Sequence, residues 1–299
     1  MKNSPSTSAG QAGSEGHTVS ETIREAAAAL SETSGTARLD AELLMAHALG
    51  VSRSDLLLRM MQSEPPEAFA RLIERRLTNE PVAYILGSQH FFGREFVVTP
   101  DVLIPRPDSE SVMEAALHAS PKPRRVLDCG TGSGALLLTV LAERPDARGA
   151  GIDSSPAALD VASRNAAALG LAERADMRLS DWTKSDWADG LGQFDLVIAN
   201  PPYVETSANL ASDVREFEPA AALFSGPEGL YDYRILIPQL PQLLTENGVA
   251  VLEIGHSQAA AVAKIASEQG FTSEVRQDLA GRDRAVILRL RLGKDESRG

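Results

Sequence analysis

The sequence is poor in the residue types that form disulfides or bind transition metals. Its 299 residues include one cysteine and five histidines. The single cysteine, Cys129, excludes an internal disulfide framework and is typical of a reducing compartment, so we expect a cytoplasmic protein. The histidines are scattered without the spacing of metal ligands, and the sequence therefore predicts no metal site.

Long apolar runs and an excess of basic residues are also missing. No apolar run approaches the roughly 20 residues that cross a bilayer, so no membrane association is expected. Residues 1–17 are rich in Ser, Gly and Ala without the apolar core of a signal peptide, which predicts a disordered tail. The net charge of −12 argues against direct nucleic-acid binding, which requires clustered Lys and Arg, and is compatible with a protein partner.

The sequence does contain enough apolar residues, 43%, for a sizeable core, and its length allows two domains. Residues 18–80 carry apolar side chains at three- and four-residue spacing, which predicts a small helical bundle. Within it, Ser20 is a candidate N-cap and Gly50 a candidate C-terminal cap. Residues 81–107 are aromatic and β-branched with glycines at turn points, and this pattern predicts a hairpin linker.

Residues 108–293 alternate strand and helix patterns, followed by a short tail at 294–299. Alternating units of this kind predict a parallel sheet covered on both faces. The last two strand candidates have no helix between them, so an antiparallel edge strand is expected. The strand candidates are RRVLDCG, ARGAGID, ADMRLSDW, FDLVIAN, GVAVLEIG, TSEVRQD and RAVILRLR. The sequence thus predicts an α/β fold with a seven-stranded, mostly parallel sheet.

A glycine-rich loop follows the first of these strands, in VLDCGTGSGALL. Gly130, Gly132 and Gly134 lie between a strand and a helix, where glycine allows a sharp turn and close approach to a ligand. Asp153 ends the next strand about 20 residues later, the distance at which a carboxylate can reach ribose hydroxyls. This pattern predicts a cofactor that contains adenosine.

The loop alone leaves the cofactor ambiguous, because Gly130, Gly132 and Ala135 also match a dinucleotide fingerprint. Asp128, at the end of the strand, favours a cationic ligand, since a carboxylate there would repel a pyrophosphate. S-adenosylmethionine carries an ammonium and a sulfonium, whereas NAD carries two phosphates. The alternative is a turn that binds no ligand.

The motif SDW, from Ser180 to Trp182, ends the third strand candidate. There an acid and an aromatic ring can frame an adenine, by hydrogen bonding to its amino group and by ring contact. An exposed helix cap with a packed tryptophan explains the motif nearly as well.

The stretch FDLVIANPPYVE ends an apolar strand at Asn200 and continues at once with two prolines. Asn200 falls at the carboxyl end of a strand, where open α/β sheets bind ligands. The Asn200 side-chain oxygen and the Pro201 carbonyl can each accept one N–H of a planar amide, and Tyr203 can cover it. Such a site catalyses by positioning and by excluding water. The alternative is a tight turn after a strand.

Several stretches together resemble the HemK/PrmC family of class I methyltransferases. These are LDCGTGSGAL, GID and NPPY, then PVAYILGSQHFFGREFVVTPDVLIPRPDSE, FEPAAALFSGPEGL and DLAGRDR. The resemblance covers roughly Arg38 to Leu292. NPPY is shared with adenine-N6 methyltransferases, whereas IPRP and AGRDR beside it make the match specific. Asp108 and Ser109 stand where the family often has Glu and Thr, which keeps a carboxylate and a hydroxyl.

The resemblance implies a Rossmann-like class I methyltransferase fold and S-adenosyl-L-methionine as cofactor. It implies N5-methylation of the glutamine in the Gly-Gly-Gln motif of class I peptide chain release factors. Residues 130–134 would wrap the methionine part of the cofactor, Asp153 would bind the ribose, and Trp182 would lie by the adenine. The cofactor-binding residues are then Asp128, Gly130, Thr131, Gly132, Ser133, Gly134, Asp153, Trp182 and Asn200.

On the substrate side, the resemblance implies that the proline turn grips the glutamine amide. The catalytic residues are then Asn200, Pro201 and Tyr203, and the substrate-binding residues are Asn200, Pro201, Pro202 and Tyr203. The helical domain would contact the release factor away from the reacting glutamine, and residues 204–231 would form a lid or docking loop. A monomer is expected.

Three other functions are compatible with parts of this pattern. The first is methylation of a glutamine in a ribosomal protein, which would share the amide site and differ in docking surface. The second is adenine-N6 methylation of nucleic acid, which needs a flipped base and a basic track and conflicts with the negative charge. The third is a module that binds the cofactor without transfer, which Asn200 and Tyr203 argue against.

Overall fold

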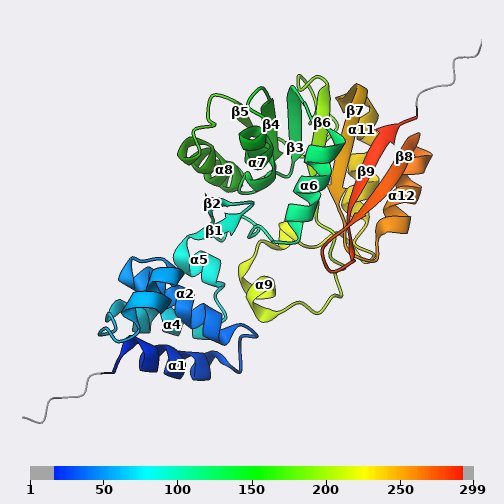
Figure 1. Ribbon diagram of the computed structural model, residues 1–299. Helices are drawn as coiled ribbons and strands as arrows, with labels where there is room; N and C mark the ends of the chain where they lie inside the picture. Colours follow the sequence, from blue (N-terminus) through cyan, green and yellow to red (C-terminus); the bar gives the residue numbers. More distant parts are fainter. Residues whose placement is uncertain (1–16, 292–299) are drawn as a thin grey trace, which may run out of the picture. The chain divides into compact units, whose positions relative to one another are not determined.

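The computed structural model describes residues 17–291, which form two compact units that meet in sequence at Leu86 and Gly87 (Figure 1). The first unit is helical. Its core is an apolar cluster with Ile23, Leu44 and Phe69. Its elements are α1 (Val19–Leu30), α2 (Ala37–Leu49), α3 (Arg53–Asp55), the π-helical turn η1 (Leu56–Met60), α4 (Ala68–Leu77) and α5 (Val82–Leu86).

The ends of the first two helices follow local capping chemistry. Helix α1 begins at Val19, and its N-cap is Thr18, whose hydroxyl accepts the Glu21 N–H while the Glu21 carboxylate accepts the Thr18 N–H. The assignment of the cap to Ser20 was therefore wrong, because Ser20 lies inside the helix. Gly50 ends α2 with a φ of 66°, as expected of a C-terminal cap.

The second unit begins with a hairpin of two antiparallel strands, β1 (Ser88–Phe91) and β2 (Arg94–Val97). The turn residues Phe92 and Gly93 have φ values of 48° and 73°, the pattern of a tight two-residue turn. The aromatic, β-branched pattern predicted this hairpin. It did not predict helix α5, which also lies within residues 81–107.

A seven-stranded sheet forms the centre of the second unit, in the order β5-β4-β3-β6-β7-β9-β8. The first five strands are parallel, and β9 runs antiparallel to both neighbours. The expected antiparallel pairing of the last two strands is confirmed, although the reversed strand is β9 and the edge strand is β8. The strands are β3 (Arg125–Cys129), β4 (Arg148–Asp153), β5 (Ala175–Leu179), β6 (Phe194–Ala199), β7 (Leu244–Glu253), β8 (Phe271–Gln277) and β9 (Asp283–Leu290).

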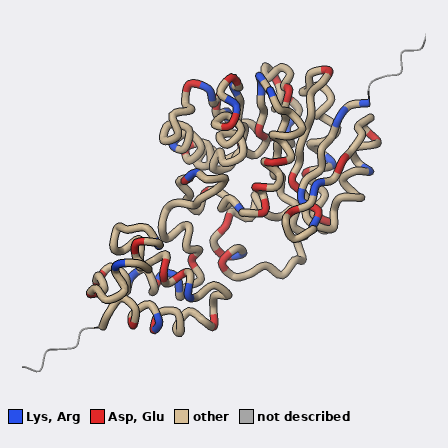
Figure 2. Tube along the Cα trace, in the orientation of Figure 1, with Lys and Arg blue, Asp and Glu red and all other residues tan. Residues whose placement is uncertain are grey.

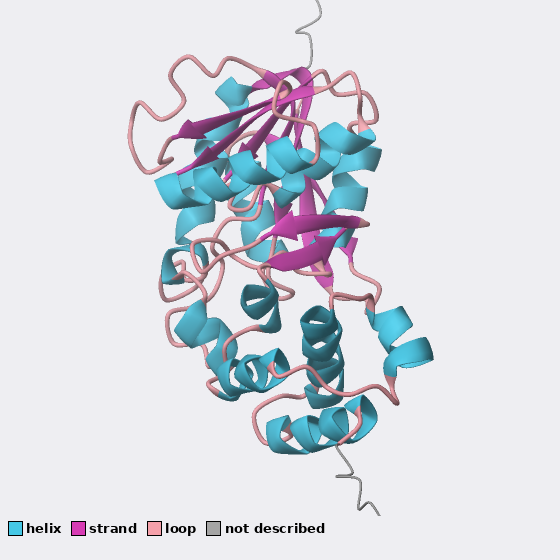
Figure 3. Cartoon of the chain, turned by 90° about the vertical axis from the view of Figure 1, so that its left-hand side faces the viewer, coloured by secondary structure: helices cyan, strands magenta, loops and turns pink. Residues whose placement is uncertain are grey.

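Helices cover both faces of this sheet (Figure 3). In β6, Leu196 and Ile198 belong to one apolar cluster, and Val197 and Ala199 belong to another, as the alternation along a strand requires. The first cluster includes residues of α6 (Ser109–Ala119), α7 (Ala135–Glu143) and α8 (Pro156–Ala168). The second includes residues of α10 (Tyr231–Leu236), η3 (Ile237–Gln239), α11 (Leu240–Leu243) and α12 (Ala259–Glu268). The segment between β6 and β7 also carries α9 (Ser212–Phe217) and the short η2 (Ala220–Ala222).

The strand order reverses between β3 and β6, which pair in parallel at the centre of the sheet. Cys129 at the end of β3 pairs with Ala199 at the end of β6. The glycine loop and Asn200 therefore leave the sheet side by side, at the switch point where open α/β sheets bind ligands.

Two properties of the described residues bear on possible partners. Lys and Arg are interspersed with Asp and Glu along both units (Figure 2). Between residues 17 and 291, no helix is long and apolar enough to span a membrane.

Candidate active site

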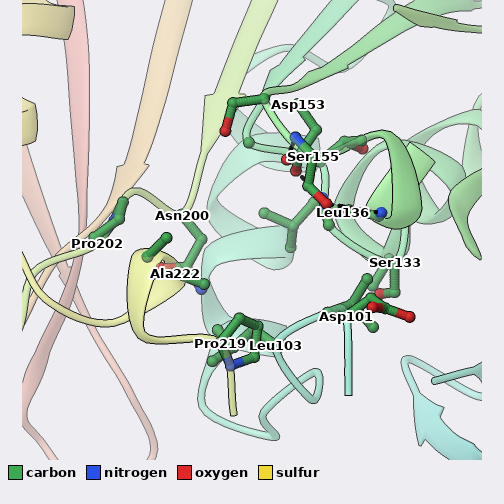
Figure 4. A pocket seen from close by; sticks show the side chains of 18 of the residues that line it. Asp101, Leu103, Ser133, Leu136, Asp153, Ser155, Asn200, Pro202, Pro219 and Ala222 are labelled. Carbon is green, nitrogen blue, oxygen red and sulfur yellow. Dashed lines mark hydrogen bonds between the residues drawn. The ribbon is translucent and has the colours of Figure 1, made fainter. Parts of the chain in front are cut away.

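A cavity of about 430 Å³ lies at the carboxyl edge of the sheet (Figure 4). The glycine loop after β3 and the turn after β4 form one part of its wall. The proline turn after β6 and the segments 101–106 and 219–222 form another part. Of the predicted site residues, the cavity is lined by Gly130, Thr131, Gly132, Ser133, Asp153, Trp182, Asn200 and Pro202. The others, Asp128, Gly134, Pro201 and Tyr203, are not among the residues that line it.

Gly130 makes room for an aromatic ring at the cavity wall. Its φ is 76°, and a Cβ atom added there would lie 3.0 Å from the ring of Trp182. Trp182 is held in turn by its indole N–H, which donates to Asp232 Oδ1 at 3.0 Å. Asp232 Oδ2 accepts the Ser225 hydroxyl at 2.7 Å. No sequence motif points to Asp232, because it lies 50 residues from Trp182.

Asp128 lies beneath the glycine loop and has no exposed surface. Its Oδ2 accepts the Thr131 hydroxyl at 2.7 Å and the Leu137 N–H at 3.3 Å, whereas its buried Oδ1 has no partner among the described residues. Burial raises the pKa of this carboxyl to about 7, although the two hydrogen bonds lower it. A buried carboxyl group with one oxygen that lacks a hydrogen bond therefore lies directly under the loop.

Asp153 presents its carboxylate at the cavity wall from the end of β4. Oδ2 accepts the Gly132 N–H at 2.9 Å, and Oδ1 accepts the Ser155 N–H at 2.9 Å. These two bonds fix the carboxylate and leave each oxygen a further lone pair for a ligand hydroxyl. The carboxylate therefore has the geometry to hold a sugar diol.

Asn200 lines the cavity directly after β6, and no other described residue forms a hydrogen bond with its side-chain amide. The two prolines that follow are buried and stiffen the turn. The Tyr203 carbonyl accepts Gln258 Nε2 at 3.0 Å, and the Tyr203 hydroxyl donates to Glu253 Oε1 at 3.4 Å. Hydrogen bonds with Gln258 and Glu253 thus hold the turn, while the Asn200 amide faces the cavity.

The wall beside Asn200 depends on a contact between distant segments. Arg106, in IPRP, pairs with Glu218, in FEPAAAL, and Glu218 also accepts the Ile104 N–H at 3.2 Å. Glu218 is 5% exposed, and burial raises its pKa. Nothing in the sequence indicates that these two stretches contact each other. The structure shows that they join to close one side of the cavity.

The described residues include no group of three His, Cys, Asp or Glu side chains placed to hold a metal ion. Cys129 is buried, and burial raises its pKa well above the ordinary thiol value, so this thiol is protonated at neutral pH. The polar groups that line the cavity are amides, hydroxyls and carboxylates, together with the Arg106 guanidinium, whose charge is paired with Glu218. They suit an uncharged or cationic ligand that offers hydrogen-bond donors.

Both units match protein families. Residues 21–87 match the PrmC N-terminal domain, and residues 122–281 match a methyltransferase domain. A release factor glutamine methyltransferase from Cereibacter sphaeroides is 45% identical over 273 residues, which are 89% of this chain and 95% of the relative. Relatives of the same name from Rhodospirillum rubrum and Burkholderia pseudomallei are each 43% identical, over 85% and 88% of this chain and 79% and 96% of their own lengths. The chain belongs to the release factor glutamine methyltransferase family.

Proposed function

We propose that this protein transfers a methyl group from S-adenosylmethionine to the side-chain amide nitrogen, N5, of the glutamine in the Gly-Gly-Gln motif of class I peptide chain release factors. Family membership supports the reaction. The structural observation that carries it is the position of Asn200, which lies at the cavity wall one residue beyond the pairing of Cys129 with Ala199. An amide-binding turn and a glycine loop therefore meet at one cavity.

The residues at the cavity fit S-adenosylmethionine, which supplies an electrophilic methyl group when bound. Asp153 is placed to accept both ribose hydroxyls, and Trp182 offers a ring surface to the adenine. The glycine loop can follow the methionine part closely. The unpartnered Oδ1 of Asp128 lies below the loop, where a bound cation would favour the ionised carboxyl.

The chain's own residues then act on the glutamine amide by orientation. An amide nitrogen is a poor nucleophile, because its lone pair is delocalised into the carbonyl group. The Asn200 side-chain oxygen and the Pro201 carbonyl accept its two N–H groups, and the Tyr203 ring covers its plane. These contacts leave one open direction of approach and exclude water.

The finer assignments extend this proposal. The helical unit serves as the docking domain for the release factor, and residues 204–231 form the loop that closes beside the substrate. The protein acts as a monomer in the cytoplasm and contacts no nucleic acid directly. The Arg106–Glu218 pair supports the closing role, because it fastens this loop to the IPRP segment.

The direct test is labelling of the substrate. We expect purified protein with labelled S-adenosylmethionine to modify a class I release factor, and labelling to fall to background when the Gly-Gly-Gln glutamine is replaced. Equal labelling of the altered factor would overturn the proposal. Label on a ribosomal-protein glutamine, or on adenine in a nucleic-acid control, would identify one of the other two transfer reactions.

A second test addresses the ribose contact. Asp153→Ala should weaken cofactor binding by about 10- to 100-fold, because hydrogen bonds to a charged group contribute about 1.5–3 kcal/mol. Calorimetric titration with S-adenosylmethionine measures this directly. Asp101→Ala is the matched control, since Asp101 also lines the cavity but its Oδ2 is bonded to the Thr99 hydroxyl at 2.8 Å. Equal losses in both variants would contradict the ribose assignment.

A further inference from the structure

Glu253 is a buried carboxyl group that the reaction described so far does not use. It is the last residue of β7 and is 1% exposed. Leu252 pairs with Ala199, so Glu253 lies on the strand next to Asn200, at the same level of the sheet. A carboxyl group is costly to bury unless hydrogen bonds compensate it, so its partners indicate why it is there.

Those partners connect three separate parts of the chain. Ser109, at the start of α6, donates its hydroxyl to Glu253 Oε2 at 2.5 Å. Tyr203, in the proline turn, donates to Oε1 at 3.4 Å. The Glu253 backbone carbonyl accepts the Tyr233 hydroxyl from α10 at 2.7 Å. The PRPDSE and NPPY motifs therefore meet at one side chain.

Among residues 17–291, no charged side chain forms a direct ion pair with Glu253. Arg284, in AGRDR, is 8% exposed and donates to Asp108 Oδ2 at 2.9 Å and to Asp278 Oδ2 at 3.4 Å. Its charge only partly offsets the burial, and the pKa of Glu253 is raised to about 7. The two donated hydrogen bonds are thus the contacts that hold the carboxyl group in place.

Tyr203 packs against the apolar cluster that contains Val197 and Ala199, and three further contacts hold it, of which Glu253 supplies the one farthest from the backbone. The Tyr203 carbonyl accepts a hydrogen bond from Gln258 Nε2. The edge of the Tyr203 ring passes Gly255, where an added Cβ would lie 3.5 Å from the ring atom Cδ2. Apolar packing limits the movement of the ring but gives its plane no polar anchor. The hydroxyl is the atom farthest from the backbone, so its bond to Glu253 is the polar contact placed to set the tilt of the ring. A length of 3.4 Å leaves room for the bond to tighten when substrate is bound.

We propose that Glu253 is a positioning residue, which fixes the ring of Tyr203 against the glutamine amide through the phenol hydroxyl. This inference rests on the proposed function and adds a residue to it. Ser109 holds the second carboxyl oxygen and thereby aims the first at Tyr203. Through Ser109, the PRPDSE motif therefore helps to align the substrate.

The test is a double-mutant cycle in the release-factor assay, with kcat and both KM values measured. Glu253→Met removes the acceptor at similar volume and should lower kcat about tenfold, with KM for S-adenosylmethionine unchanged. Tyr203→Phe should lower kcat by a similar factor, and the double variant should be no slower than either. Glu253→Gln keeps an acceptor oxygen for Tyr203, so this variant should retain most of the wild-type kcat.

Each outcome separates this inference from the proposed function. A wild-type protein that does not label release factor refutes the function itself. If the wild type is active and Tyr203→Phe retains full kcat, the inference is overturned, and this variant does not depend on whether Glu253→Met folds. If Glu253→Met lowers kcat further in the Tyr203→Phe background, Glu253 acts by another route, and this result also overturns the inference.

Discussion

Asn200→Ala should reduce methyl transfer by about 100- to 1000-fold, the effect of removing one pre-positioned polar group from an active site. The side chain lies at the cavity wall, and its amide forms no hydrogen bond with another described residue. In the proposed reaction, removing it takes away an acceptor that orients the substrate nitrogen. Single-turnover transfer to release factor at saturating cofactor measures this loss.

The same variant should retain most of its cofactor affinity. One lost hydrogen bond contributes about 0.5–1.5 kcal/mol, so binding should weaken by no more than about tenfold. Calorimetry on the variant provides the control for its fold and for the cofactor site. If cofactor binding disappears, Asn200 serves chiefly the cofactor, and the division of roles between Asn200 and Asp153 is wrong.

Gly229→Ala should disable the site from a position outside the cavity. Gly229 has a φ of 66°, and an added Cβ would lie 2.2 Å from the Tyr203 carbonyl oxygen and 2.8 Å from Gln258 Nε2. The backbone of the proline turn must move to relieve this contact. Because misplacing a reactive group by about 1 Å can cost a factor of about 100, we expect a loss of kcat of that order. The melting temperature should also fall.

Gly226→Ala is the matched control for this change. Gly226 lies in the same loop with a φ of 77°, but the nearest atom to an added Cβ is the Tyr231 Cβ at 3.6 Å, an ordinary contact. Both alanines carry the left-handed backbone cost of about 1–2 kcal/mol. Only Gly229→Ala adds the clash with Tyr203. Equal losses of kcat in the two variants would show that backbone strain, and not displacement of the proline turn, causes the defect.

The sheet could be predicted because its strands carry strong local signals. The run FDLVIAN is apolar on both faces of β6, as a central parallel strand requires. The start of β7 was predicted late, at Gly248, whereas the strand begins at Leu244. The pairing with β6 shifts between Phe194 and Leu196, so the first residues of β7 join through an irregular register that no periodicity reveals.

The site was predictable where one short motif carries the chemistry. Gly130 and Asn200 follow strands directly, Asp153 is the last residue of β4, and the carboxyl ends of parallel strands share one edge of the sheet. By contrast, the contacts of Glu218 and Glu253 join residues 112 and 144 positions apart. The burial of Asp128 and the unpartnered state of its Oδ1 are likewise not visible in the sequence. Sequence patterns describe neighbours along the chain, and these features depend on packing in three dimensions.

The pairing of Cys129 with Ala199 has a consequence for how such enzymes can diversify. Adjacent strands lie about 4.8 Å apart, a spacing that main-chain hydrogen bonds maintain whatever the side chains. In the proposed reaction the methyl donor lies after one of these strands and the acceptor after the next, so the ladder spacing sets the separation between them. The loops around the cavity can change in length and sequence to admit a different planar nitrogen, and the distance that the methyl group must cross stays the same.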